Sequence, residues 1–270
     1  MEVFILPAMA LVLLALAFLI FAGGRRLRPG AAAVVSRAWI FLLGAGILIS
    51  PWAPVAGAED EVRHKLAAGE IMVSAKEISG KALKCGEMTG VVDAAPEIVW
   101  QVITDINAYK FFMPRTLNSM AVAPEKLPLL LQRRPSRAEE VEQILGPIPA
   151  DPAGTRIPDG KYSVYLYSHL NFPWPCNNRW YIIKLMQDET RAGEHCYQSS
   201  WSLVSGNLRE NSGEWLLEPF EATKTKVTYR LLTDPGGAIP GFLVDRGTCT
   251  IMPQIIKAVR KRVADPGGRR

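Results

Sequence analysis

The sequence predicts an α+β domain in which a curved antiparallel sheet packs against a long C-terminal helix, behind an N-terminal membrane or signal segment. Three observations lead to this fold class. A hairpin and a short helix are predicted first, at residues 71–104. Five strand-like runs follow between residues 161 and 233, and their short connections imply antiparallel neighbours. Finally, apolar residues recur every four positions over 242–263, as in a helix with one buried face.

The composition fits a folded chain with a weakly charged main domain. Of 270 residues, 49% are apolar and 21% are charged, which excludes a disordered chain. Residues 1–58 contain four basic side chains and one acidic one, which leaves 27 basic and 25 acidic residues in 59–270. Strong phosphate binding needs a dense basic face. Because residues 59–270 have a net charge of only +2, nucleic acid is not an expected partner.

The first 58 residues are predicted to direct the chain to a membrane. Residues 3–22 contain no charge and are long enough to cross a hydrocarbon core of about 30 Å. Residues 38–49 are short for a span but match a signal-peptide core, followed by small residues near Ala58. Two topologies remain open: a membrane hairpin with the Arg-rich loop 23–30 in the cytoplasm, or removal of everything up to Ala58. Both make residues 59–270 a membrane-associated or secreted domain on the extracytoplasmic side, which is the periplasm in a bacterium.

The first elements of the domain 59–270 are a hairpin and a helix. Strands are predicted at 71–79 and 83–92, and Pro96 opens a helix over 97–104 because proline suits the first helical position. An aromatic loop follows at 105–114. Residues 121–160 contain seven prolines and are predicted to form a surface insertion with one short helix. This insertion is either an irregular connection or a cover over a pocket.

The remaining elements complete the sheet and add the terminal helix. Strands are predicted at 161–169, 179–187, 196–204, 214–220 and 224–233. The helix 242–263 contains Pro253, which either kinks it or marks the start of its regular part. A single helix cannot fill the hollow of a six- or seven-stranded sheet. We therefore expect a cavity between the sheet and this helix.

Alternation along the strands identifies candidate cavity residues. The apolar side chains expected to face inward are Tyr165, Tyr167, Trp201, Leu203, Trp215, Leu217, Val227, Tyr229 and Leu231, with Ile251, Ile255 and Val259 from the helix. The expected cavity mouth consists of Phe111, Phe112, Gly236, Gly237, Ile239 and Pro240. Arg179 and Arg230 either anchor a polar head group or form salt bridges.

The cysteines and histidines do not indicate a metal or catalytic centre. Cys85, Cys176, Cys196 and Cys249 are widely spaced, without the close pairs that zinc sites use. They either form up to two disulfides or remain small buried thiols. Among the three histidines only His169 is expected near the cavity mouth, and no hydrolase, metalloprotease or nucleotide-binding motif is present. No metal, cofactor or catalytic residue is therefore expected.

Several short motifs follow one another in a characteristic order across residues 65–264. They are Asp93-Ala94-Ala95-Pro96-Glu97, Phe112-Met113-Pro114, Phe172-Pro173-Trp174-Pro175, Gly213-Glu214-Trp215 and Asp234-Pro235-Gly236-Gly237. In this order the sequence resembles the START domain, the steroidogenic-acute-regulatory-protein-related lipid-transfer module. The resemblance implies a helix-grip fold with a tunnel for one lipid or other hydrophobic molecule. We therefore expect non-catalytic binding and transfer of such a ligand at a membrane.

The resemblance also defines an alternative. The START fold is similar to that of polyketide cyclases and aromatases, so the alternative is a cyclase-, aromatase- or hydrolase-like enzyme on the same scaffold. Trp180 and the pair Asp245-Arg246 depart from the family pattern. The identity of the ligand is therefore not carried over from the family.

Overall fold

The computed structural model describes residues 56–77, 84–147, 160–172, 177–237, 241–265 and 267. Side chains are described for these residues except 56–58, 77, 84, 85, 241–246, 248 and 249. The chain divides into two compact units, Met1–Ala56 and Gly57–Arg270, and the described residues belong almost entirely to the second. The predicted apolar runs 3–22 and 38–49 lie outside the described residues. No helix in the described part is long and apolar enough to span a membrane.

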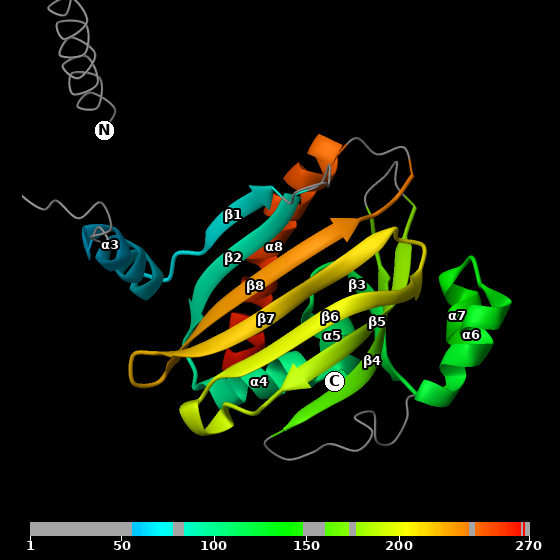
Figure 1. Cartoon of the computed structure of the whole chain (residues 1–270), viewed down its shortest axis with the longest axis horizontal. Helices are drawn as coiled ribbons and strands as arrows, with labels where there is room; N and C mark the ends of the chain where they lie inside the picture. The colour runs from blue at the N-terminus through cyan, green and yellow to red at the C-terminus, as the bar shows by residue number, and fades with distance from the viewer. Residues whose placement is uncertain are drawn as a thin grey trace, which may run out of the picture. The chain divides into compact units, whose positions relative to one another are not determined.

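A single antiparallel sheet of eight strands forms the centre of this unit, in the order β1-β2-β8-β7-β6-β5-β4-β3 (Figure 1). The strands are β1 (Met72–Glu77), β2 (Lys84–Val92), β3 (Thr116–Val122), β4 (Lys161–Leu170), β5 (Arg179–Asp188), β6 (Tyr197–Gly206), β7 (Glu210–Phe220) and β8 (Lys224–Asp234). Strands β3 to β7 each pair with the next strand in sequence, as short connections favour. The predicted α+β class with an antiparallel sheet is confirmed.

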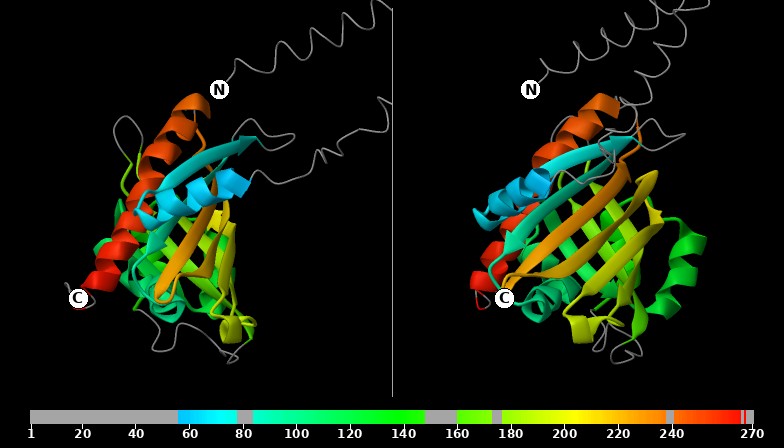
Figure 2. Two further views of the ribbon diagram at one scale, coloured as in Figure 1. Left: turned by 90° about the vertical axis from the view of Figure 1, so that its left-hand side faces the viewer. Right: turned by 60° about the vertical axis from the view of Figure 1, so that its left-hand side comes forward.

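Helices lie against both faces of the sheet. They are α3 (Ala56–Ala67), α4 (Pro96–Thr104), α5 (Tyr109–Phe112), α6 (Leu127–Arg133), α7 (Ala138–Leu145) and α8 (Gly241–Ala264). Figure 2 shows α8 running along one face of the curved sheet, which confirms the predicted terminal helix. The helix continues through Pro253. We call the face that packs against α4 and α8 the inner face, and the opposite one the outer face.

Each face of the sheet has its own apolar cluster. On β4, Val164 and Leu166 belong to the inner cluster, whereas Tyr165 and Tyr167 pack in an outer cluster with α6 and α7. Successive side chains of a strand point to opposite faces, so this alternation requires two covered faces. Val141 of α7 is completely buried in the outer cluster. The Pro-rich segment therefore covers the outer face of the sheet.

Two features differ from the sequence prediction. Strand β3 begins before the predicted insertion and forms an eighth strand, and the described part of the insertion holds two helices, α6 and α7. Strand β3 was missed because its register shifts between Thr116 and Asn118, which interrupts the two-residue period. Helix α6 was missed because Pro128 stands near its start, where proline is tolerated and does not break a helix.

Candidate ligand-binding site on the inner face

The inner face of the sheet carries no charged side chain at its central described positions. These are the alternate residues of β2 (86–92), β4 (162–168), β5 (181–187), β6 (197–203), β7 (211–217) and β8 (227–231). Charged side chains occupy the other row, where Arg230 on β8 forms ion pairs with Glu87 and Glu214. An ionised group among these central positions would lack a counter-charge there, so this part of the face suits an uncharged, largely apolar molecule. Charged residues lie only beyond the two ends of this β5 row: Arg179, and Glu189, whose buried carboxylate accepts from the Trp100 indole N–H and the Tyr162 hydroxyl.

The second half of α8 fills one end of the inner face. Met252, Ile256 and Val259 are almost completely buried in the inner cluster. Helix and sheet approach closely at Gly90, where an added Cβ would lie 3.1 Å from the Ile256 side chain. This end is therefore packed like an ordinary core.

The inner face stays accessible at its other end, where β8 leads toward α8. Leu203 and Leu231 point inward but are only half-buried, whereas Leu217 and Val227 further along the same face are fully buried. Tyr181 at the start of β5 is also half-buried. Apolar side chains that remain accessible on a concave face offer contact surface to a ligand.

A polar network crosses the inner face at this accessible end. The Trp201 indole Nε1–H donates to Asn211 Oδ1 at 2.8 Å. The Tyr181 hydroxyl is hydrogen-bonded with Ser168 and Asn211, and burial raises its pKa in spite of these bonds. The network therefore spans β4, β5, β6 and β7 with neutral groups only. The sequence analysis missed Tyr181, although its alternation with Ile183 on β5 could have placed it on the inner face.

Tyr229 supplies an unused polar atom beside this network. The residue is only 8% exposed, and its ring contacts Trp215 and Trp201 at centroid distances of 4.5 and 5.5 Å. Burial raises its pKa well above the usual value, so the phenol is protonated. Its hydroxyl has no hydrogen-bond partner among the described residues. It is therefore able to donate to an oxygen of a ligand.

Most predicted cavity residues lie together on the inner face. Nine of them pack in or against the inner cluster: Trp201, Leu203, Trp215, Leu217, Val227, Tyr229, Leu231, Ile255 and Val259. Ile251 is half-buried and lies outside the clusters. The role of these residues as a cavity lining stays a prediction. Tyr165 and Tyr167 differ from the expectation, because they lie on the outer face under α6 and α7. Alternation predicts two rows but does not say which row faces inward.

The predicted mouth residues lie near different ends of α8. Gly236 and Gly237 precede the helix, and both have the positive φ angles that glycine adopts without strain. The ring of Phe112 instead lies 5.8 Å from the guanidinium of Arg262, in the last turns of the helix. Ile239 and Pro240 lie outside the described residues.

Both candidate arginines make polar contacts within the described part of the protein. Arg179 Nε–H donates to the backbone oxygen of Pro235 at 2.9 Å, so it holds the turn before α8. Arg230 forms the predicted salt bridges, with Glu87 and Glu214 on the outer face. These contacts hold both side chains to the scaffold, and the role of either arginine toward a ligand stays a prediction.

The histidines do not lie on the inner face either. His169 Nδ1 lies 3.7 Å from a Glu142 carboxylate oxygen of α7, on the outer side of the sheet. His195 pairs with Glu97 at an exposed position, and His64 is exposed on α3. Cys196 is a buried free thiol, while the side chains of the other three cysteines lie outside the described residues.

An eight-stranded antiparallel sheet that holds a long C-terminal helix against its inner face defines a START-like domain. The structure search supports this assignment. A STAR-related lipid transfer protein from Xanthomonas axonopodis has a TM-score of 0.53 and 21% identity, over 72% of this chain and 93% of that chain. Human StAR-related lipid transfer protein 5 has a TM-score of 0.51 and 14% identity, over 78% of this chain and 94% of that chain. At these identities the likeness establishes the fold.

Sequence comparison adds one short match. An uncharacterized protein of Pseudomonas aeruginosa is 32% identical over 88 residues, which cover 30% of this chain and 44% of that protein. The match thus spans less than half of the relative. No family model matches the sequence.

Proposed function

We propose that this domain binds one uncharged hydrophobic molecule, a lipid or an isoprenoid, on the inner face of its sheet and carries it without chemical change. The observation that carries the proposal is an inner face without charge at its central described positions, whose apolar side chains stay accessible at one end, beside a Tyr229 hydroxyl that has no hydrogen-bond partner among the described residues. The names of the two structural neighbours, both lipid-transfer proteins, agree with it. No acidic, basic, histidine or cysteine side chain lies at the central described positions of the inner face, which supports a non-catalytic role.

The energetics of such a carrier favour exchange with a bilayer. Enclosing roughly 400 Å² of apolar ligand surface stabilises the complex by about 10 kcal/mol relative to water, before the ordering costs are subtracted. A bilayer provides the same ligand with a comparable apolar environment. Transfer between protein and membrane is therefore nearly balanced, and its rate depends on opening the accessible end of the inner face.

A basic aromatic surface supports membrane contact. We define it as Lys110, Phe111 and Phe112 of α5 with Lys261 and Arg262 of α8. Phe111 is 52% exposed, and the Lys110 Nζ lies 5.3 Å from its ring centroid. Residues 109–118 and 254–264 together contain six Lys or Arg residues and no Asp or Glu. An exposed ring with a cation beside it suits the interface of an anionic bilayer, where each cation contributes about 1 kcal/mol.

We place the domain on the extracytoplasmic side of a membrane. The apolar runs 3–22 and 38–49 and the Arg-rich loop between them support this location. A fusion of alkaline phosphatase after residue 58 tests it, because this reporter is active only after export. An inactive fusion, present in full length in the cytoplasm, would contradict the location and leave the binding proposal intact.

The binding proposal is tested by native mass spectrometry and by titration with the neutral fluorophore N-phenyl-1-naphthylamine. We expect a co-purified neutral lipid and saturable fluorophore binding. Leu203→Arg introduces a charge on the inner face and should abolish binding. Met186→Arg, on the exposed outer row of β5, is the matched control and should leave binding unchanged. A wild-type protein without lipid or fluorophore binding, or equal binding by both variants, would contradict the proposal.

A further inference from the structure

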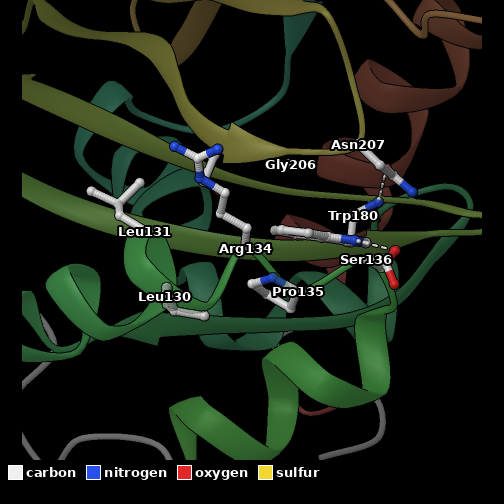
Figure 3. Close-up of a pocket in the computed structure, with 9 residues that line it drawn as sticks. Leu130, Leu131, Arg134, Pro135, Ser136, Trp180, Gly206 and Asn207 are labelled. Carbon is white, nitrogen blue, oxygen red and sulfur yellow. Dashed lines mark hydrogen bonds between the residues drawn. The ribbon is translucent and has the colours of Figure 1, made fainter.

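A hollow lies on the outer face, between α6, the turn after it and the strands β5 and β6 (Figure 3). Its volume is about 610 Å³, within the range of small-molecule sites. The side chains of Leu130 and Trp180 form its base and are 1% and 3% exposed. Leu131, on one side, is 50% exposed. Accessible apolar surface is therefore offered mainly at the side, by Leu131 and the half-buried Pro135, above the buried base. We call this hollow the outer groove.

The base of the outer groove is held in place by close backbone packing. At Gly206 an added Cβ would lie 2.6 Å from the backbone oxygen of Trp180, so no side chain fits there. The Trp180 backbone N–H donates to Asn207 Oδ1 at 2.8 Å, and Trp180 Nε1–H donates to the Ser136 backbone oxygen at 3.3 Å. The indole plane is thereby oriented before any ligand binds, which lowers the ordering cost of binding.

Arg134 is the only charged residue that lines the outer groove. It ends α6 in the left-handed conformation, and its backbone N–H donates to the Leu130 backbone oxygen at 2.9 Å. Figure 3 shows its guanidinium extending over the groove between Leu131 and Gly206. Within the described part of the chain this guanidinium has neither an ion pair nor a hydrogen bond. The groove therefore combines an apolar base with one uncompensated positive charge.

We propose that the outer groove binds a small amphipathic organic anion, a carboxylate or sulfonate on a flat aromatic or branched apolar body. The Arg134 guanidinium pairs with the anionic group, for which its planar donor geometry is suited. Leu131 and Pro135 contact the apolar body, over the base formed by the buried Leu130 and Trp180 side chains. This site lies on the opposite face of the sheet from the neutral inner face and is independent of the proposed carrier function. The charge of the ligand distinguishes the two sites, because an anion would lack a counter-charge on the inner face.

Two fluorophores of similar size and different charge test this inference on the folded protein. The anionic probe is 8-anilinonaphthalene-1-sulfonate, and the neutral probe is N-phenyl-1-naphthylamine. Arg134→Gln should weaken binding of the sulfonate by about fivefold or more, since one charge-assisted pair is lost, and leave the neutral probe unaffected. Arg133→Gln removes the adjacent exposed charge, which does not line the groove, and should leave both affinities unchanged. Leu131→Asp should also weaken the sulfonate selectively.

Other results would overturn the inference. Equal sulfonate affinity in wild type and Arg134→Gln would show that the anion binds elsewhere. Equal losses in Arg133→Gln and Arg134→Gln would indicate general electrostatic attraction in place of a site. A third result would be that Leu131→Asp converts a dimer into a monomer in sedimentation experiments, while the sulfonate does not compete with dimer formation. In that case a second copy of the chain covers the groove in place of an organic anion. The neutral probe, measured in the same samples, reports separately on the inner face.

Discussion

The indole ring of Trp201 lies across Gly213, its direct partner on the neighbouring strand β7. An added Cβ at position 213 would lie 2.4 Å from Trp201 Cζ2 and 2.2 Å from the backbone oxygen of Arg230. The missing side chain allows the ring to lie flat on the sheet, where Asn211 accepts its N–H. Gly213 therefore determines how closely the Trp201 ring approaches the sheet at the centre of the candidate site.

Gly213→Ala should destabilise the domain by about 2 kcal/mol or more, because the methyl group forces the Trp201 ring or the β8 backbone to move. Urea unfolding measures the change in the free energy of unfolding. Gly193→Ala is the matched control, since no atom lies within 4 Å of an added Cβ there. Similar unfolding midpoints for the two variants would show that the indole does not depend on the glycine.

Tyr229→Phe separates ligand recognition from packing. The ring remains between its tryptophan neighbours, and the lost hydroxyl has no partner among the described residues, so stability should change little. A ligand that offers an oxygen acceptor should bind about fivefold more weakly, as expected for one lost hydrogen bond. Tyr109→Phe is the control, because this hydroxyl donates to the backbone oxygen of Ile103 and its loss should reduce stability. Unchanged affinity for an acceptor-bearing ligand would exclude the Tyr229 contact.

Phe111→Asp should reduce binding to vesicles of phosphatidylcholine with one quarter phosphatidylglycerol. The substitution removes an exposed ring and adds a negative charge within the basic aromatic surface. Co-sedimentation at low and high salt measures the effect, and wild-type binding should fall as salt screens the cations. Ile98→Asp, at a 48% exposed position on α4, is the matched control. If both variants bind like wild type, the surface does not contact the membrane.

Asp188 should make stability depend on pH below about 4. Burial of this carboxyl opposes ionisation, but hydrogen bonds from Lys161 and Thr190 outweigh burial and lower its pKa to about 2. A lowered folded-state pKa stabilises the protein above the unfolded-state pKa, and this stabilisation is lost as pH falls toward 2.

Asp188→Asn should therefore cost roughly 1 kcal/mol at pH 7, with solvent screening considered, and much less near pH 2. Unfolding measured at several pH values tests this difference. Glu125→Gln, which removes an exposed carboxylate, is measured alongside as the control. If the difference in the free energy of unfolding between wild type and Asp188→Asn is constant from pH 7 to pH 2, the lowered pKa of Asp188 is contradicted.

Much of the fold was predictable because it depends on local patterns. Apolar residues at every fourth position in 242–263 and alternation in the strands after residue 160 identified α8 and five strands. Pro96 marked the start of α4 in sequence and structure alike. Strand β3 escaped the analysis, since its irregular register near Leu117 hides the period of two.

The sequence by itself determined which residues alternate on each strand, the neutral character of one row and the amphipathic terminal helix. Only the tertiary structure decided which row faces α8, because a two-residue period is the same for either face. Tyr165 and Tyr167 show the consequence: α6 and α7 cover them on the outer face, since the insertion packs there. The Tyr181–Asn211 contact and the Arg134 groove join residues about 30 or more positions apart in the chain. Such contacts depend on how elements pack, which no local pattern encodes.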